Sequence, residues 1–189
     1  MDRQKQTGKF ISRIAENLPE MNKEAMQRWI DDPQGLQEYL RGLSPEFDLL
    51  KFVGTVRVDG AERFVCDDEA LKKANVGWTG SNFDRLFKGK VEENVSATEL
   101  NIHKLKKPSV DQPIRKELGD KEEIHLVHFL NFLKNQNGGW CIAYIRDKKG
   151  KLWAVRACWF SVDRYWDVAA RSVKHPFGWS AGSRVVSRK

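Results

Sequence analysis

The sequence WCIAYIRDKKGKLWAVRACWF, residues 140–160, places two apolar runs on either side of a short charged segment that ends in glycine. Runs rich in β-branched and aromatic residues that flank such a segment are typical of a β-hairpin. In one register, a three-residue loop ends at Gly150 in the left-handed conformation, and Ile145 lies opposite Trp153. We therefore expect two antiparallel strands here.

The two faces of this hairpin differ in chemistry, because successive side chains of a strand point to opposite sides. The first register predicts a core face made of Cys141, Ala143, Ile145, Trp153, Val155, Ala157 and Trp159. The opposite face then carries Trp140, Tyr144, Arg146, Leu152, Arg156 and Cys158. A four-residue loop is the alternative; it would group Trp140, Ile142, Tyr144, Trp153 and Val155 and leave Arg156 alone outside.

The positive charge of the chain is unevenly distributed. The 189 residues carry a net charge of +7, with 33 Lys and Arg against 26 Asp and Glu. Residues 140–189 contain eleven of these cations and three of the anions, a net charge of +8. The 22 cations and 23 anions of residues 1–139 therefore nearly cancel. Five of the seven tryptophans lie in the same segment. Such an arrangement can indicate a face that binds polyanions.

The composition also limits the class of protein. Hydrophobic residues at 40% and charged residues at 31% are typical of a globular protein. We expect no membrane span, because no apolar run approaches eighteen residues, and no secretory signal at the N-terminus. The cysteines are Cys66, Cys141 and Cys158, and they lack the spacing of a disulfide framework or a zinc site. A cytoplasmic location is the simplest expectation.

The pattern of the remaining chain predicts an α+β fold. Helical spacing indicates N-terminal helices over 10–18, 21–30 and 32–42, the last with Asp32 as its N-cap. A small mixed unit follows, with strands at 49–58, 62–66 and 98–105, a short helix starting near Asp67, and a helix at 81–89 for which Ser81 and Asp84 have capping-box spacing. A mostly buried helix is expected over 122–136, packed under the C-terminal antiparallel hairpin unit, and an edge strand at 184–189.

Residues 108–119, with their prolines and charges, are the best candidate for a connector. They would separate a helical N-terminus and small α/β unit, residues 1–107, from a basic, Trp-rich α+β unit, residues 120–189. One continuous domain is the alternative.

Four segments carry a resemblance to a family: AMQRWIDDPQGLQEYLRGL (25–43), CDDEALKKANVGWTGSNFDRLF (66–87), IRDKKGKLWAVRACWF (145–160) and RVVSRK (184–189). In order and length they resemble small uncharacterised proteins frequent in candidate-phyla bacterial genomes. The resemblance implies a strand followed by a capped helix, a Trp-containing turn, a second short helix, a hairpin, and a basic C-terminus. It implies an architecture and no activity.

Three patterns associated with catalysis are weak here. GWSAG, residues 178–182, matches the nucleophile elbow of α/β-hydrolases, but no acid or histidine follows it. His125 and His128 have the spacing to share a metal on a helix, with Glu122 or Glu123 as a third ligand. We expect instead that the pair belongs to a partly exposed polar stripe whose imidazoles bond to backbone or water. TGSNFDRLFKGK, residues 79–90, lacks the glycine spacing of a phosphate-binding loop, and Val91 stands where such a loop has Ser or Thr.

We expect a non-catalytic protein that acts as a protein-interaction or accessory module through its basic, aromatic C-terminal face. The alternative is a protein that binds single-stranded nucleic acid or a phosphate backbone, and a second alternative is a metal-dependent enzyme that uses His125 and His128. No cofactor is expected, and the oligomeric state is left open. The predicted contact residues are Trp140, Tyr144, Arg146, Lys148, Lys149, Lys151, Arg156, Arg164 and Lys174.

Overall fold

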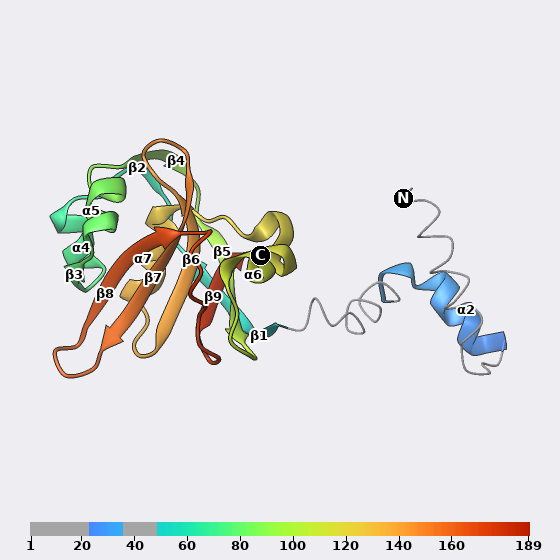
Figure 1. Cartoon of the computed structure of the whole chain (residues 1–189). Coiled ribbons are helices and arrows are strands. Elements are labelled where there is room, and N and C mark those ends of the chain that lie inside the picture. Colours follow the sequence, from blue (N-terminus) through green and yellow to red (C-terminus); the bar gives the residue numbers. More distant parts are fainter. Residues whose placement is uncertain (1–22, 36–48) are drawn as a thin grey trace. The chain divides into compact units, whose positions relative to one another are not determined.

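The computed structural model describes residues 23–35 and 49–189 (Figure 1). The chain divides into two units, Met1–Pro45 and Glu46–Lys189, which are described separately. In the first unit, helix α2 spans Lys23–Asp31. A helical turn follows at 33–35, where the Asp32 carboxylate accepts a hydrogen bond of 2.8 Å from the Gly35 N–H, as the predicted N-cap requires. The expected helix at 10–18 and most of that at 32–42 lie outside the described residues.

The second unit is built on a seven-stranded mixed sheet with helices on both faces, and the predicted α+β class is confirmed. Its strands, in spatial order, are β1 (Leu50–Val58), β5 (Thr98–Leu105), β9 (Arg184–Arg188), β6 (Trp140–Arg146), β7 (Leu152–Phe160), β8 (Tyr165–Ser172) and β3 (Val76–Thr79). A separate antiparallel pair joins β2 (Ala61–Val65) to β4 (Val91–Val95). The helices are α4 (Asp68–Lys73), α5 (Ser81–Phe87), α6 (Asp111–Leu118) and α7 (Leu126–Lys134), with a 3-10 turn, η2, at Gly119–Lys121.

The hairpin of β6 and β7 has the first of the two predicted registers. Ile145 lies opposite Trp153 and Ala143 opposite Val155, and Gly150 has a φ of 77°. The loop is held by the side chain of Asp147, which accepts hydrogen bonds from the N–H groups of Lys149 and Lys151 and from the Trp153 indole. The predicted core face is therefore the observed one.

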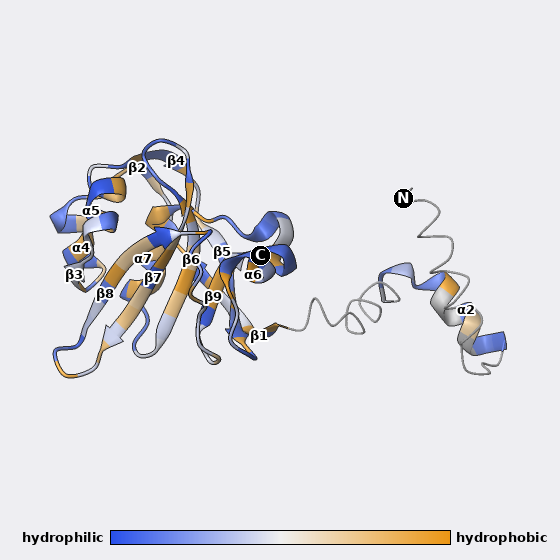
Figure 2. Ribbon diagram, in the orientation of Figure 1, coloured by the Kyte–Doolittle hydropathy of each residue, from blue (hydrophilic) through white to orange (hydrophobic). Residues whose placement is uncertain are grey.

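The larger core lies between this face of the sheet and helices α4, α5 and α7 (Figures 1 and 2). Helix α7 begins at Leu126, four residues later than predicted, because residues 122–125 do not adopt helical structure. Its first two N–H groups, those of Leu126 and Val127, donate to the carboxylate of Glu92 on β4 at 3.0 and 2.9 Å. A side chain from a distant strand thus caps the helix.

A second, smaller core lies on the opposite face of the sheet, under α6 and Trp179. Residues 108–119, expected as a connector, contain α6, whose Ile114 is fully buried. Tyr144 is also fully buried in this core, so the expectation that its ring is exposed is wrong. The alternation of β6 was interpreted correctly, but α6 covers this part of the outer face.

Two further expectations about single elements are corrected by the structure. The strand β9 was predicted at an edge, but it lies inside the sheet, antiparallel to β5 and parallel to β6. Strand β9 thus pairs with β5, which precedes residues 108–119 in the sequence, and with β6, which follows them. Helix α5 lacks the capping box, because Gly80 is its N-cap and Asp84 instead accepts a hydrogen bond from the Thr79 hydroxyl. Within 23–35 and 49–189, no helix has the length and apolarity to span a membrane.

Candidate binding surface

The structure separates the predicted contact residues into several groups. Trp140 and Arg156 lie together on the outer face of β6 and β7, where the Arg156 guanidinium is 5.1 Å from the centre of the Trp140 ring. Arg164 lies in the β7–β8 turn and Lys174 lies just beyond the end of β8. The remaining cations, Arg146, Lys148, Lys149 and Lys151, lie at or beside the hairpin loop. Because β6 has seven residues, the loop is about 20 Å from Trp140.

Several cations of the hairpin loop are engaged in contacts within the protein. Arg146 forms an ion pair with Glu123 at 2.9 Å and donates to the Gly150 carbonyl. The Lys148 ammonium donates to the carbonyl of Lys88 at the end of α5. Lys151 lies 4.9 Å above the Trp153 ring. These contacts indicate that the loop cations help to fix the hairpin against its neighbours.

The outer side of β8, β3 and the second half of β7 carries exposed side chains, whereas Ala154, earlier in β7, is buried in the second core. We call this surface, together with the start of β6, the open face; its side chains include Trp78, Trp140, Arg156, Phe160, Asp167 and Arg171. Trp78 reaches it through a β-bulge between Val76 and Trp78, which pairs Trp78 with Asp167. A Cβ at Gly77, inside the bulge, would lie 2.4 Å from the Tyr165 ring, so this close approach requires glycine.

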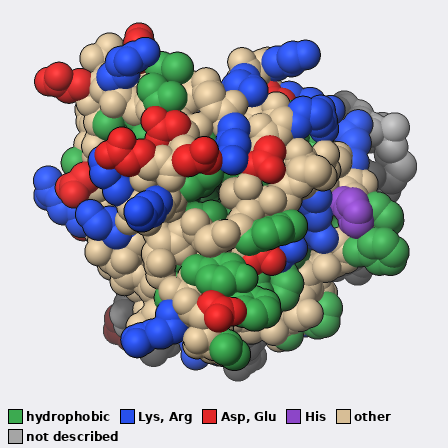
Figure 3. Space-filling view, turned by 90° about the vertical axis from the view of Figure 1, so that its left-hand side faces the viewer, with side chains coloured by type: hydrophobic (Ala, Val, Ile, Leu, Met, Phe, Trp, Pro, Cys, Tyr) green, Lys and Arg blue, Asp and Glu red, His purple; other side chains and the backbone are tan. Residues whose placement is uncertain are grey.

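Large aromatic side chains are exposed on the open face. The exposed fractions are 49% for Trp78, 45% for Trp140 and 47% for Phe160. The Phe160 ring is stacked on that of Tyr165, with 5.6 Å between their centres. Figure 3 views the side of the molecule on which α4, α5, β3 and β8 lie, and shows hydrophobic side chains gathered in its lower part, with acidic and basic groups intermixed above them. The open face itself combines exposed aromatic rings with charges of both signs, since Arg156 and Asp167 lie 4.0 Å apart on it.

A pocket of about 350 Å³ opens on this face beside the loop that leads to β9. We call it the Trp–Arg pocket; its lining includes Trp140, Arg156, Arg171, Trp179, Ser180 and Ser183. Each arginine is placed over one tryptophan, since the Arg171 guanidinium lies 3.3 Å from the centre of the Trp179 ring. Arginine stacked on an aromatic ring keeps its N–H groups available at the edge of the guanidinium plane.

The base of the Trp–Arg pocket is held by the buried carboxylate of Asp111, at the start of α6. Its Oδ1 accepts hydrogen bonds from the Trp179 indole at 2.7 Å and the Tyr144 hydroxyl at 3.0 Å. Its Oδ2 lies 3.4 Å from the Arg171 guanidinium. Burial and the adjacent carboxylate raise the pKa of Tyr144, so its hydroxyl stays protonated and donates. Burial lowers the pKa of Arg171, although Asp111 opposes this effect.

Two buried polar atoms beside the Trp–Arg pocket have no hydrogen-bond partner in the protein. They are the Nε of Arg171, a donor, and the Oδ1 of Asp167, an acceptor. The nearest cation to Asp167 is Arg156, at 4.0 Å, which is too long for a hydrogen bond. Buried polar atoms normally have a partner. One donor and one acceptor thus lie buried beneath the open face without a partner in the protein.

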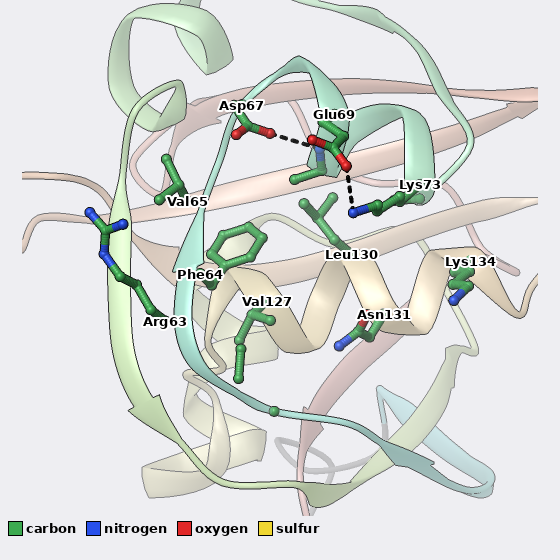
Figure 4. A pocket seen from close by; sticks show the side chains of 14 residues that line it. Arg63, Phe64, Val65, Asp67, Glu69, Lys73, Val127, Leu130, Asn131 and Lys134 are labelled. Carbon is green, nitrogen blue, oxygen red and sulfur yellow. Dashed lines mark hydrogen bonds and ion pairs between the residues drawn. The ribbon is translucent and has the colours of Figure 1, made fainter.

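A second cavity, of about 390 Å³, lies between β2, α4 and α7 (Figure 4). Phe64, Val127 and Leu130 form its apolar floor. Much of its polar rim is already paired, since Glu69 forms an ion pair with Lys73 at 2.7 Å and the Asp67 carboxylate caps α4.

The two histidines lie at the start of α7 with their ring centres 5.4 Å apart. The Nε2 of His128 is 2.9 Å from the carbonyl of Ser96, and burial keeps the pKa of His128 below its usual value. This contact agrees with the predicted polar stripe bonded to backbone. Among the residues that the structure describes, no group of three or more His, Cys, Asp and Glu side chains is suited to hold a metal ion.

Sequence reasoning missed Arg171, Trp179, Asp111, Asp167 and Trp78. Trp179 and Ser180 belong to GWSAG, which forms a loop leading into β9, without the strand–turn–helix context of a nucleophile elbow. The motif therefore contributes a tryptophan to a pocket. For Asp167 and Arg171 a signal was available, because the alternation of side chains along β8 puts both residues on the same face of the sheet.

The chain was also compared with known proteins. No protein-family model matches it, and neither the curated proteins nor the solved structures include a significant match.

Proposed function

We propose that this chain is a protein-interaction module, accessory to a partner protein that binds on the open face. The strongest support is the exposure of Trp78, Trp140 and Phe160 beside two arginines on an uncovered sheet surface. Tryptophan and arginine contribute most often to the binding free energy of protein interfaces. An exposed apolar patch surrounded by polar groups is typical of a surface that contacts another protein.

The charges of the open face favour a protein partner over a nucleic acid. Arg171 faces Asp111 at 3.4 Å and Arg156 faces Asp167 at 4.0 Å, so each guanidinium has a carboxylate nearby. Nucleic-acid binders gain most of their affinity by neutralising several phosphates with uncompensated cations. The lysines of the hairpin loop are about 20 Å away from Trp140 along β6. A polyanion would therefore gain little from this surface.

Affinity capture from a lysate of the source organism, treated with nuclease, tests the proposal. The full chain is compared with a double variant, Trp78→Ala and Trp140→Ala, that keeps the fold. Loss of a dominant interface tryptophan costs at least about 2 kcal/mol, or roughly 30-fold in affinity. We expect the same protein to be captured by the unchanged chain in independent lysates, and to bind the double variant at least 30-fold more weakly when purified and measured by calorimetry.

The matched control replaces Lys148, Lys149 and Lys151 by glutamate, which reverses the charge of the hairpin loop. Because this also removes the contacts of Lys148 with Lys88 and of Lys151 with Trp153, the fold of the variant is first compared with that of the unchanged chain by its ¹H–¹⁵N spectrum. We expect this triple variant to bind the captured protein as the unchanged chain does. Two outcomes would instead identify a nucleic-acid binder that works through the loop. In the first, nuclease treatment abolishes capture; in the second, the triple lysine variant no longer captures the protein while the double tryptophan variant still does.

A further inference from the structure

The loop between α7 and β6 contains the dipeptide Asn137–Gly138, and no other asparagine of the sequence is followed by glycine. Asparagine is one of the thermolabile residues of proteins. Its side-chain amide carbon can be attacked by the nitrogen of the next peptide group. Glycine after the asparagine favours this attack, because it has no Cβ to hinder the nitrogen and its backbone rotates more easily than that of other residues.

Both reacting groups of this dipeptide lack a hydrogen-bond partner. Asn137 is exposed and lies outside regular secondary structure, between the turn at the end of α7 and the bend at Gly138–Gly139. Neither its side-chain amide nor the N–H of Gly138 forms a hydrogen bond with any residue of 23–35 or 49–189. A Cβ at Gly138 would meet no atom within 4 Å, so the space beside this residue is open. The nitrogen can therefore approach the side chain without breaking a contact.

Asn135, two residues earlier, has the opposite arrangement and provides an internal comparison. The nitrogen that would attack its side chain belongs to Gln136 and donates to the carbonyl of Leu133 at 3.0 Å. The side-chain amide of Asn135 donates to the carbonyl of Asn131 at 3.4 Å. Attack at Asn135 thus requires the loss of two hydrogen bonds, whereas attack at Asn137 requires the loss of none.

We propose that Asn137 is a site of spontaneous deamidation. The Gly138 nitrogen loses its proton to base and forms a bond to the Cγ of Asn137; the bond from Cγ to Nδ2 breaks, and the amide takes up a proton and leaves as ammonia. The product is a five-membered succinimide ring, which water then opens. Cleavage of the new N–Cγ bond gives aspartate, and cleavage between the nitrogen and the main-chain carbonyl carbon gives isoaspartate. In each case the nitrogen regains its proton and one carboxylate remains.

The modified residue would lie beside a cation and close to the open face. The Arg184 guanidinium donates to the Oε1 of Gln136 at 3.1 Å and to the Gly138 carbonyl, so it is bonded on both sides of residue 137. A carboxylate at this position brings a negative charge to that guanidinium. Isoaspartate also adds one atom to the main chain between the two anchors. We therefore expect the modification to shift Trp140, the exposed first residue of β6.

Ageing of the full chain in water enriched in ¹⁸O, at a mildly alkaline pH, tests the proposal. One tryptic peptide, residues 135–146, carries both Asn135 and Asn137, and its fragmentation in a mass spectrometer separates them. Because water opens the ring, each deamidated Asn137 should carry one ¹⁸O, while digestion in ordinary water adds none. We expect Asn137 to lose its amide at least about tenfold faster than Asn135, and the rate to rise with pH because the attacking nitrogen must lose its proton.

The contribution of the folded loop is measured against the chain unfolded in urea, where the rate depends on the local sequence alone. We expect the rate at Asn137 in the folded chain to be within about threefold of that in urea. A folded-state rate more than about tenfold lower would show that the loop keeps the two groups apart and would overturn the proposal. Equal rates at Asn135 and Asn137 in the folded chain would overturn it as well.

Asn137→Gln is the matched variant, because attack on its longer side chain must close a six-membered ring, which forms more slowly. In the unchanged chain labelled with ¹⁵N, we expect a second indole N–H signal of Trp140 to grow in step with the ¹⁸O content. The variant should gain neither the label nor the second signal. A second signal that grows equally in the variant, or a single signal while the label accumulates, would contradict the effect on Trp140. The reaction needs no partner, so these outcomes are independent of the function proposed above.

Discussion

Asp111 holds three side chains of the second core at once, and its carboxylate is fully buried. We expect Asp111→Ala to lower the free energy of unfolding by about 3 kcal/mol, because it leaves the Tyr144 hydroxyl, the Trp179 indole and the Arg171 guanidinium without their acceptor. Urea unfolding measured by tryptophan fluorescence gives this value. The exposed neighbour Gln112 provides the control, since Gln112→Ala should change the stability by less than about 0.5 kcal/mol. Equal effects of the two substitutions would contradict the role of Asp111.

The same residues show what can be predicted for single side chains. Alternation along β6 and β7 placed Trp140, Tyr144 and Arg156 on one face, and the pairing of the strands confirms this. Burial of Tyr144 could not be predicted, because its cover comes from α6, which begins 33 residues earlier at Asp111. Alternation determines the side of the sheet to which a residue points; whether that side is covered depends on contacts between distant segments.

At the scale of elements, the start of helix α7 depends on one carboxylate from β4. Burial opposes ionisation of Glu92, but hydrogen bonds from Lys90 and from the N–H groups of Val127 and Leu126 outweigh it and keep the pKa of Glu92 below its usual value of 4.5. A carboxylate with a lower pKa in the folded state stabilises the fold at pH values above the unfolded pKa. This contribution is lost as the pH falls through the folded pKa.

We therefore expect Glu92→Gln to lower the free energy of unfolding by about 2 kcal/mol at neutral pH, because its hydrogen bonds lose the charge of the acceptor. The difference from the unchanged chain should shrink as the pH falls below about 4.5. Unfolding by urea at a series of pH values measures both effects. Glu93→Gln is the control on the same strand, where the carboxylate is exposed and 4.0 Å from Arg63. A difference that stays constant down to low pH would mean that the charge of Glu92 does not act through the helix.

The elements differ in how well the sequence predicts them. The strand at 98–105 follows from side-chain alternation and agrees with the structure. For the hairpin the sequence left two registers open, and the structure has the one with a three-residue loop that ends at Gly150. The position of β9 inside the sheet does not follow from its own residues, because pairing with β5 and β6 joins segments far apart in the chain. The prolines and charges of residues 108–119 indicated a connector, but α6 is stabilised by the sheet beneath it rather than by its own propensity.

At the scale of the molecule, the positive charge of residues 140–189 does not form the single basic face that the sequence suggested. The cations fall on the hairpin loop, the open face, the β7–β8 turn and the end of β8. Several of them have acidic partners from the N-terminal part of the second unit, such as Glu123 with Arg146 and Glu99 with Lys189. Net charge by segment therefore overestimates the charge of any one surface, since the fold brings both signs together.

Both core clusters and the complete sheet lie within Glu46–Lys189, as far as residues 49–189 describe them. We therefore expect a fragment of residues 46–189 to fold alone, with a Tm within about 3 °C of that of the full chain, which corresponds to about 1 kcal/mol for a domain of this size. Calorimetry measures the Tm, and overlay of the ¹H–¹⁵N spectra shows whether the fold is the same. A Tm lower by 10 °C or more, about 3 kcal/mol, would show that residues 1–45 contribute to the stability of the sheet unit. The fragment that ends at residue 119 is the matched comparison: it lacks β6, β7, β8 and β9, and we expect it to show no cooperative transition.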